Sequence, residues 1–282
     1  MSFMDLPDHC LLLIFDCCEL NTLTTLTTVC TKLKLLICTH IFHKNNTFDL
    51  AAKNKQDIAR CLVSVARLVR AVNPSNFHVQ VYRNLQACKE MPIISVDTAT
   101  SSTEVFVESH FMESLHCLNN ICDRITAVTI YMSIYDCHDN DVCDLMNFET
   151  WSNIKKFSIN GHDKSTRHYL EFPENIWDVD IMSFGCMFIT NDIFNDAVGM
   201  GENLKHIIFQ NCKLEYLHPV NLIMLAETVR RRGGHFPLGL TFTNVEMNSE
   251  EFLEAMLNDD VQTYVFIQIE SIFSANNLAC KI

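Results

Sequence analysis

Residues 4–42 read MDLPDHCLLLIFDCCELNTLTTLTTVCTKLKLLICTHIF, and this stretch decides how the N-terminal part of the chain folds. Asp5 can cap a helix, and Pro7 suits the first turn, where its missing N–H would have no intrahelical partner. Three apolar runs at helical spacing follow, the second after a cap at Asn21 or Thr22: Leu11, Leu12, Ile14 and Phe15; Leu23, Leu26 and Val29; Leu33, Leu35, Leu36, Ile37, Ile41 and Phe42. Three short helices cannot bury all of this surface against one another, so we expect part of it to contact a partner.

Three paired landmarks in this stretch have a spacing typical of one family. Leu6-Pro7, Ile14-Phe15 and Val29-Cys30 resemble the landmarks of the F-box, a small helical domain, over roughly residues 3–45. Two positions depart from the family pattern. Thr22 stands where an acidic residue usually begins the second helix, and Leu33 stands where a tryptophan is usual.

The resemblance implies a partner rather than a reaction. F-box proteins are substrate-recognition subunits of SCF-type (cullin–RING) ubiquitin ligases, in which the F-box binds a Skp-type adaptor and the adaptor binds the cullin. By this resemblance the chain is not an enzyme, and a repeat-containing region after the F-box would bind an unknown target protein. The positions expected to bind the adaptor are Leu6, Pro7, Leu11, Ile14, Phe15, Leu26, Val29, Cys30 and Leu33.

Two other functions stay open from the residues. The departures at Thr22 and Leu33 favour a non-catalytic repeat scaffold whose F-box is vestigial. The cysteines also allow a small hydrolase or transferase with a cysteine nucleophile, although no spacing nominates one.

The rest of the chain carries a recurring apolar pattern. The unit apolar-x-x-apolar-x-apolar occurs at Ile125/Val128/Ile130, Ile154/Phe157/Ile159, Ile176/Val179/Ile181 and Leu204/Ile207/Phe209, with weaker copies beginning at Pro237 and Val261. Start-to-start spacings of 29, 22, 28, 33 and 24 residues mostly match leucine-rich repeats. Helical patterns intervene at 142–151, 192–198, 220–231 and 249–257. The copy LKHIIFQNCKL also places Cys212 where a cysteine-type repeat has its turn.

This second region resembles the degenerate leucine-rich repeats of F-box proteins. A strand followed by a helix is a crossover between parallel strands, and stacked crossovers share a core. We therefore expect an α/β fold: a three-helix F-box at 1–48, a helical linker at 49–75, and an irregular leucine-rich-repeat solenoid with a parallel curved sheet at 76–282. The pattern is too irregular to assign a repeat at Val79/Val81 and Ile94/Val96. It predicts either a strand or a loop at Val105/Val107.

The repeat register predicts an exposed sheet face, because side chains alternate along a strand. The residues between the core positions form five rows: Ala127/Thr129/Tyr131, Lys156/Ser158/Asn160, Asp178/Asp180/Met182, His206/Ile208/Gln210 and Gly239/Thr241/Thr243. Trp177 lies beside them and is a candidate anchor. The residues expected to bind the target protein are Tyr131, Lys156, Asn160, Trp177, Asp178, Asp180, His206 and Gln210.

Composition narrows the partners and the compartment. A net charge of −13 disfavours a nucleic-acid partner. The 14 cysteines are scattered, and many lie in apolar surroundings. Since the sequence also shows no signal-peptide pattern, we expect reduced thiols in the cytoplasm or nucleus. No apolar stretch approaches the ~20 residues of a membrane span. Arg230-Arg231-Arg232 before Gly233-Gly234 is typical of a helix C-terminus, with a phosphate or peptide contact as the alternative.

Motifs for cofactor or metal chemistry are missing. Cys38, His40 and His43 fit packing within the helical domain better than a metal site, because no CxxC pair or HExxH motif accompanies them. With seven glycines and no P-loop pattern, the chain has few loops able to cradle a phosphate. We therefore expect neither a metal nor another cofactor.

Overall fold

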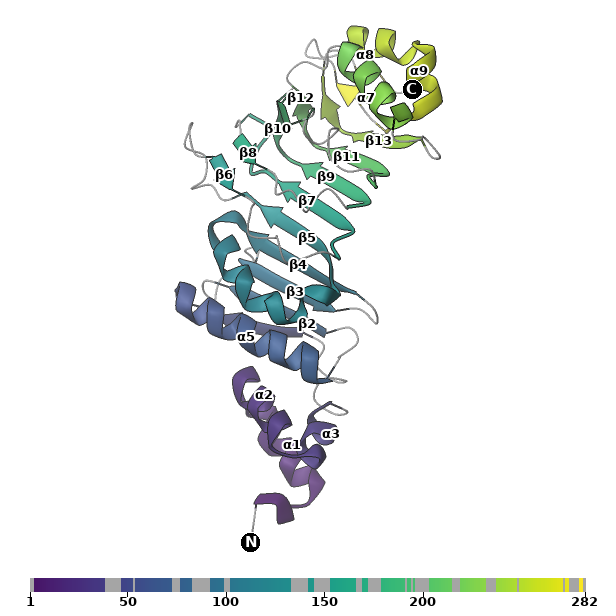
Figure 1. The fold of residues 1–282 in the computed structure, drawn as a ribbon. Coiled ribbons are helices and arrows are strands. Elements are labelled where there is room, and N and C mark those ends of the chain that lie inside the picture. Colours follow the sequence, from purple (N-terminus) through teal and green to yellow (C-terminus); the bar gives the residue numbers. More distant parts are fainter. Residues whose placement is uncertain are drawn as a thin grey trace. The chain divides into compact units, whose positions relative to one another are not determined.

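The structure is a computed structural model, and it describes residues 3–38, 47–52, 54–72, 77–82, 92–98, 102–132, 142–144, 153–165, 169–171, 179–190, 192–193, 195, 203–214, 219–231, 237–247, 249–270, 272–273 and 279–280. The chain divides into two compact units: Met1–Val107 with Phe111–Thr126, and Glu108–His110 with Ala127–Ile282. The architecture is mixed α/β with mostly parallel strand pairing, as the sequence predicts (Figure 1). The predicted domain boundaries near residues 48 and 75 stay predictions.

The N-terminal part of the first unit is helical. A short 3-10 turn, η1 (Phe3–Asp5), precedes α1 (Asp8–Asp16), α2 (Leu20–Val29) and α3 (Thr31–Leu36). The predicted caps are wrong. Asp5 is the last residue of the 3-10 turn, and Pro7, not Asp5, is the N-cap of α1. Helix α2 begins at Leu20, so neither Asn21 nor Thr22 can be its N-cap. Ile41 and Phe42, predicted to prolong the third helix, lie outside the described residues.

Each of these three helices contributes buried apolar side chains. The buried side chains are Leu11, Phe15, Leu20, Leu23, Leu33, Leu36 and Ile37. Threonine is a mediocre helix former, but α2 accommodates its buried threonines through local hydrogen bonds. The Thr24 hydroxyl donates to the Leu20 carbonyl at 2.8 Å, and the Thr27 hydroxyl donates to the Thr24 carbonyl at 2.7 Å. Two polar groups are thereby buried without losing their hydrogen bonds.

The first unit also contains a four-stranded array. Strand β1 (Thr47–Ala51) runs parallel to β2 (Phe77–Tyr82), and β2, β3 (Ile94–Thr98) and β4 (Thr103–Glu108) pair antiparallel. The antiparallel pairing explains why the apolar positions of β2 to β4 do not fit a parallel repeat. Val105 and Val107, which the pattern left between strand and loop, lie in β4.

Two helices accompany this array. Helix α5 (Lys55–Val72) lies within the segment predicted as helical, although β1 occupies the beginning of that segment. Its buried face contains Ile58, Leu62, Val65 and Val69, and the helix packs against α2 and β2 (Figure 1). The 3-10 helix η4 (Ser109–Arg124) follows β4, and Arg124 donates to the Val69 carbonyl of α5 at 3.1 Å.

The second unit is organised around in-register parallel strands. Their order is β5 (Ile125–Tyr131), β7 (Lys156–Asn160), β9 (Ile181–Gly185), β11 (His206–Gln210), β13 (Leu238–Thr243) and β15 (Val265–Ile269). Two columns of core residues cross them: Val128, Phe157, Met182, Ile207, Leu240 and Ile267; Ile130, Ile159, Phe184, Phe209, Phe242 and Ile269. The phenylalanine rings stack along the second column, with centroids 5.6 Å apart for Phe184–Phe209 and 5.3 Å for Phe209–Phe242.

The columns confirm four of the six predicted apolar triplets and correct two. In the copy that begins at Val261, the core residues are Ile267 and Ile269, because Phe266 lies on the opposite, exposed face of the sheet. In the segment that contains β9, the core residues Val179, Met182 and Phe184 replace the predicted triplet Ile176/Val179/Ile181. Ile181 lies on the opposite face of the sheet, and Ile176 lies outside the described residues. Both triplets satisfy the same spacing three residues apart, so apolar periodicity alone could not choose between them. With the corrected register, Phe157 to Met182 and Met182 to Ile207 are equal steps of 25 residues.

A sharp turn follows each of three strands and leads into a second, smaller sheet. Cys186, Asn211 and Asn244 occupy equivalent positions with φ of 48°, 54° and 54°, a conformation that asparagine tolerates better than most residues. The Asn244 side-chain amide donates to Asn211 Oδ1, which links neighbouring turns. The smaller sheet then forms from β10 (Phe188–Ile189), β12 (Lys213–Leu214), β14 (Val245–Glu246), β16 (Ile272–Phe273) and β17 (Ala279–Cys280).

Cys212 lies directly after one of these turns and is fully buried. Its thiol lies 3.3 Å from the Phe184 carbonyl and 3.4 Å from the Gln210 carbonyl, so it can bond to both carbonyls where the strand ends. This is the position that the sequence assigned to the turn residue of the repeat.

Three helices lie at the C-terminal end of the second unit: α7 (Pro219–Arg231), α8 (Ser249–Met256) and α9 (Asp259–Tyr264). Two of the predicted helical segments, 220–231 and 249–257, are thereby confirmed. The prediction at Val142 is wrong, since Val142–Asp144 is strand β6 and pairs parallel with β8 (Tyr169–Glu171). Of the segment 192–198, only Asp192, Ile193 and Asn195 are described, and they are helical.

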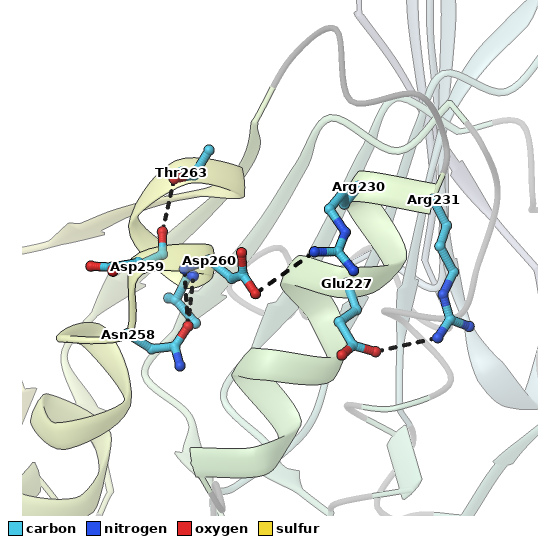
Figure 2. A network of polar contacts seen from close by, with 8 residues as sticks. Glu227, Arg230, Arg231, Asn258, Asp259, Asp260 and Thr263 are labelled. Carbon is cyan, nitrogen blue, oxygen red and sulfur yellow. Dashed lines mark hydrogen bonds and ion pairs between the residues drawn. The ribbon is translucent and has the colours of Figure 1, made fainter.

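Polar contacts at α7 and α9 account for the arginine cluster (Figure 2). Arg230 lies 3.9 Å from Asp260 of α9, and Arg231 lies 3.3 Å from Glu227 one turn earlier in α7. The Asn258 side chain caps α9 by accepting from the backbone N–H groups of Asp260 and Val261. The helix C-terminus predicted at Arg230-Arg231 is confirmed, while Gly233-Gly234 lie outside the described residues.

Candidate protein-interaction surfaces

The N-terminal helices combine a filled core with exposed apolar side chains. Leu13, Val29 and Leu35 are 65%, 62% and 63% exposed, and Ile14 is 39% exposed. They lie on α1, at the end of α2 and on α3. Other apolar residues of these helices are buried, so these four side chains do not contribute to the core and are available to a partner.

The structure divides the nine residues predicted to bind an adaptor. Ile14, Val29 and Pro7 are exposed, and Leu6, Leu26 and Cys30 are half-buried. Leu11, Phe15 and Leu33 are at most 1% exposed, because they form the core between the helices. The Cys30 thiol accepts a hydrogen bond from the Leu33 N–H at 3.5 Å, so Cys30 caps α3.

Two exposed residues were missed by the sequence analysis. Leu13 and Leu35 do not belong to the three paired landmarks. Because these helices are apolar on several sides, the sequence does not indicate which side is exposed to solvent. An ion pair of 3.0 Å between Lys32 and Asp8 connects the first turns of α3 and α1. Both partners are largely exposed, so its contribution to stability is at most about 1 kcal/mol.

Comparison with known families identifies this helical domain. The F-box domain family matches residues 3–45. No curated protein sequence gives a significant match to the chain. An F-box domain indicates a role in SCF-type ubiquitin ligase complexes, where F-box domains bind Skp-type adaptors, and F-box proteins are typically adaptors rather than enzymes.

A second surface is the face of the parallel sheet opposite its core columns. The strand register aligns three rows across β5 to β15: Ala127, Lys156, Ile181, His206, Gly239 and Phe266; Thr129, Ser158, Ser183, Ile208, Thr241 and Gln268; Tyr131, Asn160, Gly185, Gln210 and Thr243. Hydroxyl and amide groups dominate these rows. The charged member is Lys156, although the chain as a whole is strongly acidic.

The corrected register changes one predicted row of this face. Met182 is fully buried in the core, and Ile181, Ser183 and Gly185 take the places predicted for Asp178, Asp180 and Met182. Asp180 lies just before β9, where it forms an ion pair of 3.2 Å with Lys205. Trp177 and Asp178 lie outside the described residues. The other predicted target-binding residues lie on the sheet face: Tyr131, Lys156, Asn160, His206 and Gln210.

Two glycines on this face leave room for side chains of the neighbouring strands. A Cβ at Gly239 would be 3.0 Å from His206 Nδ1, and a Cβ at Gly185 would clash with Asn160 Oδ1. His206 Nε2 lies 2.8 Å from Thr241 Oγ1. Burial lowers the pKa of His206 and raises the pKa of Tyr131. The imidazole is therefore held in its neutral form against the sheet.

The described residues show little that favours a cysteine nucleophile. Burial raises the pKa of the Cys38, Cys61 and Cys117 thiols, and it raises the pKa of Cys212 to about 11. A raised pKa reduces the thiolate fraction that nucleophilic attack requires. Within the part of the chain that the structure describes, no group of three His, Cys, Asp or Glu residues could hold a metal ion.

One polar trio outside both surfaces has a catalytic-looking composition. His78 Nδ1 lies 2.7 Å from Asp97 Oδ2, and His78 Nε2 lies 3.4 Å from Ser95 Oγ. Ser95 is only 3% exposed, so a substrate could not reach its hydroxyl. The trio therefore supplies a hydrogen-bond partner for the hydroxyl of a buried serine. None of the described helices is long and apolar enough to cross a membrane.

Proposed function

We propose that this protein is a substrate-recognition subunit of an SCF-type ubiquitin ligase. Its F-box would bind a Skp-type adaptor and, through it, the cullin, while the repeat-containing region at 76–282 would bind the target protein. The observation that carries the proposal is an F-box whose core is filled while Leu13, Ile14, Val29 and Leu35 stay exposed.

The proposal separates two roles within the F-box. Leu11, Phe15 and Leu33 would hold the three helices together, and Ile14 and Val29 would enter the adaptor interface directly. Burying such side chains on binding contributes roughly 1.5–3 kcal/mol for each residue that becomes fully covered. Pro7, Leu6, Leu26 and Cys30 would border the same interface.

The parallel sheet would act as the target-binding part, built as a leucine-rich-repeat solenoid. Its exposed rows support this role because they offer hydroxyl, amide and apolar groups on a rigid, in-register frame. Tyr131, Lys156, Asn160, His206 and Gln210 would contact the target. The protein would increase the rate of ubiquitin transfer by holding the target near the ligase, and not by chemistry of its own.

Adaptor capture tests the proposal. The full chain is purified with a Skp-type adaptor, beside an Ile14→Asp/Val29→Asp double variant and a Met224→Asp control. Met224 is 59% exposed on α7, so the control adds a charge at an exposed apolar side chain outside the F-box. We expect the wild type and the control to retain the adaptor and the double variant to lose it, with all three showing the same thermal unfolding.

Two results would contradict the proposal. A folded wild-type chain that captures no adaptor would favour the alternative, a repeat scaffold with a vestigial F-box. Capture by the double variant at the wild-type level would show that the exposed apolar side chains are not the adaptor interface.

A further inference from the structure

β15 is the last described strand in the parallel sheet of the second unit. In each core column the first five residues are completely buried, as Phe209 and Phe242 illustrate. The sixth residues, Ile267 and Ile269, are only half-buried, because no described strand follows β15 in this sheet. The two columns of apolar side chains thus continue to the last strand and are left partly uncovered there.

Among the described residues, no strand pairs with the outer edge of β15. The Glu270 N–H donates to the Phe242 carbonyl of β13 at 2.9 Å. Since successive residues of a strand direct their N–H and C=O groups to opposite sides, Ile267 and Ile269 direct theirs away from β13. An edge of this kind is a template for another strand.

Residues that usually protect an edge are missing from β15. Its sequence is Val265-Phe266-Ile267-Gln268-Ile269, without charge, proline or glycine. Phe266 is 61% exposed on the open sheet face. Edge strands usually carry charges, prolines or bulges that prevent pairing with another chain, so an apolar, uncharged edge indicates that something covers it.

The strand is complementary to itself. In an antiparallel pair centred on Ile267, Val265 lies opposite Ile269 of the second copy, Phe266 opposite Gln268, and Ile267 opposite Ile267. Apolar core residues would then meet apolar core residues on one face of the sheet. No two like charges would be opposite one another, because Glu270 would face Tyr264.

We propose that β15 is a dimerisation edge, at which two copies of this chain join their parallel sheets through an antiparallel β15–β15 pair about a twofold axis. A second copy fits better than a charged partner, since the strand offers no charge to recognise in a chain with a net charge of −13. A closed twofold pair also uses up both exposed edges at once, which prevents further addition of strands. The proposal is independent of the F-box and its adaptor.

The oligomeric state of the full chain tests the proposal. Molar mass is measured by light scattering over a range of concentrations for the wild type, an Ile267→Lys variant and a Leu257→Lys control. The first variant places two lysines opposite each other at the centre of the pair, and the control adds the same charge at an exposed residue outside β15. We expect a concentration-dependent dimer for the wild type and the control, and a monomer for Ile267→Lys.

Hydrogen exchange of the wild type provides a test that does not depend on the variant folding. We expect the amides of Ile267 and Ile269 to become protected as the concentration rises, while the amide of Glu270 is protected throughout. A wild type that stays monomeric at every concentration would overturn the proposal. It would equally be overturned by a dimer whose amides in 265–269 exchange at the same rate at all concentrations.

Discussion

The F-box and the parallel sheet differ in where their buried and exposed apolar side chains lie. In the F-box, core and exposed apolar residues are direct neighbours in sequence, as with Ile14 at 39% and Phe15 at 1% exposure. In the parallel sheet, the apolar residues of the two core columns stack from strand to strand and are completely buried until the last strand. The difference shows that exposed apolar side chains occur on all three helices of the F-box, whereas in this sheet the most exposed apolar side chain, Phe266, lies on the last described strand.

The core column of the sheet should give the largest effect when it is interrupted. Phe209 is fully buried and stacks between Phe184 and Phe242. We expect Phe209→Ala to lower the free energy of unfolding by about 3–5 kcal/mol, measured by urea denaturation. Met224→Ala, at a residue 59% exposed, should change it by no more than about 0.5 kcal/mol. A loss below about 1 kcal/mol for Phe209→Ala would mean that the column does not carry the stability of the sheet.

Neighbouring residues of α1 should separate stability from binding. Leu11 is fully buried, so Leu11→Ala should destabilise the protein by about 2–5 kcal/mol. Ile14→Ala should leave the thermal unfolding of the chain nearly unchanged and weaken adaptor binding about tenfold, a loss of roughly 1.4 kcal/mol. Calorimetry of adaptor binding and of thermal unfolding measures both. The distinction between the two residues fails if Ile14→Ala unfolds the domain or binds the adaptor with undiminished affinity.

The helices at the end of the sheet offer a smaller effect. Asn258 accepts hydrogen bonds from two backbone N–H groups at the start of α9, at 3.0 Å and 3.4 Å (Figure 2). We expect Asn258→Ala to reduce stability by about 1 kcal/mol, and Asn258→Asp to restore it. Chemical denaturation of the three proteins makes the comparison, and equal stability of all three would show that the cap is unimportant here.

The smallest expected effect is a pH dependence that arises on the sheet face. The pKa of His206 is lowered by burial from its ordinary value of 6.5. As the pH falls, the unfolded chain therefore takes up this proton first. The stability associated with neutral His206 is present above pH 6.5 and is lost below it, as the pH falls through the lowered pKa of the folded state. His206→Gln should flatten this part of the stability profile between neutral and mildly acidic pH. An identical profile for the two proteins would show that His206 does not titrate differently on folding.

Much of the fold could be predicted because it follows from local periodicity. The three paired landmarks identified the F-box, and the stretch Leu204–Leu214 showed the complete strand-and-turn unit of the sheet, with Cys212 correctly placed at its turn. Helix α7 was recognisable from its apolar spacing and its terminal arginines. In each of these segments the relevant contacts lie within a few residues of one another.

The remaining features depend on partners that are distant in sequence. Hydrogen bonding to β7 and β11 selects Met182 and Phe184 as core residues, where the sequence allowed a register three residues earlier. Antiparallel pairing of β2, β3 and β4 was invisible in a pattern that suits either orientation. In the F-box, only the packing of three helices together decides that Phe15 is buried while Ile14 is exposed.

The sequence by itself therefore determined the kind of several elements, such as β11 and α7, and the presence of an F-box, because helical and strand periodicities are properties of neighbouring residues. The tertiary structure alone decided the register of β9, the side of α1 that stays exposed and the uncovered end of the sheet at β15. These depend on which strand or helix lies next to a residue, and a local apolar pattern is the same whether its neighbour is present or absent.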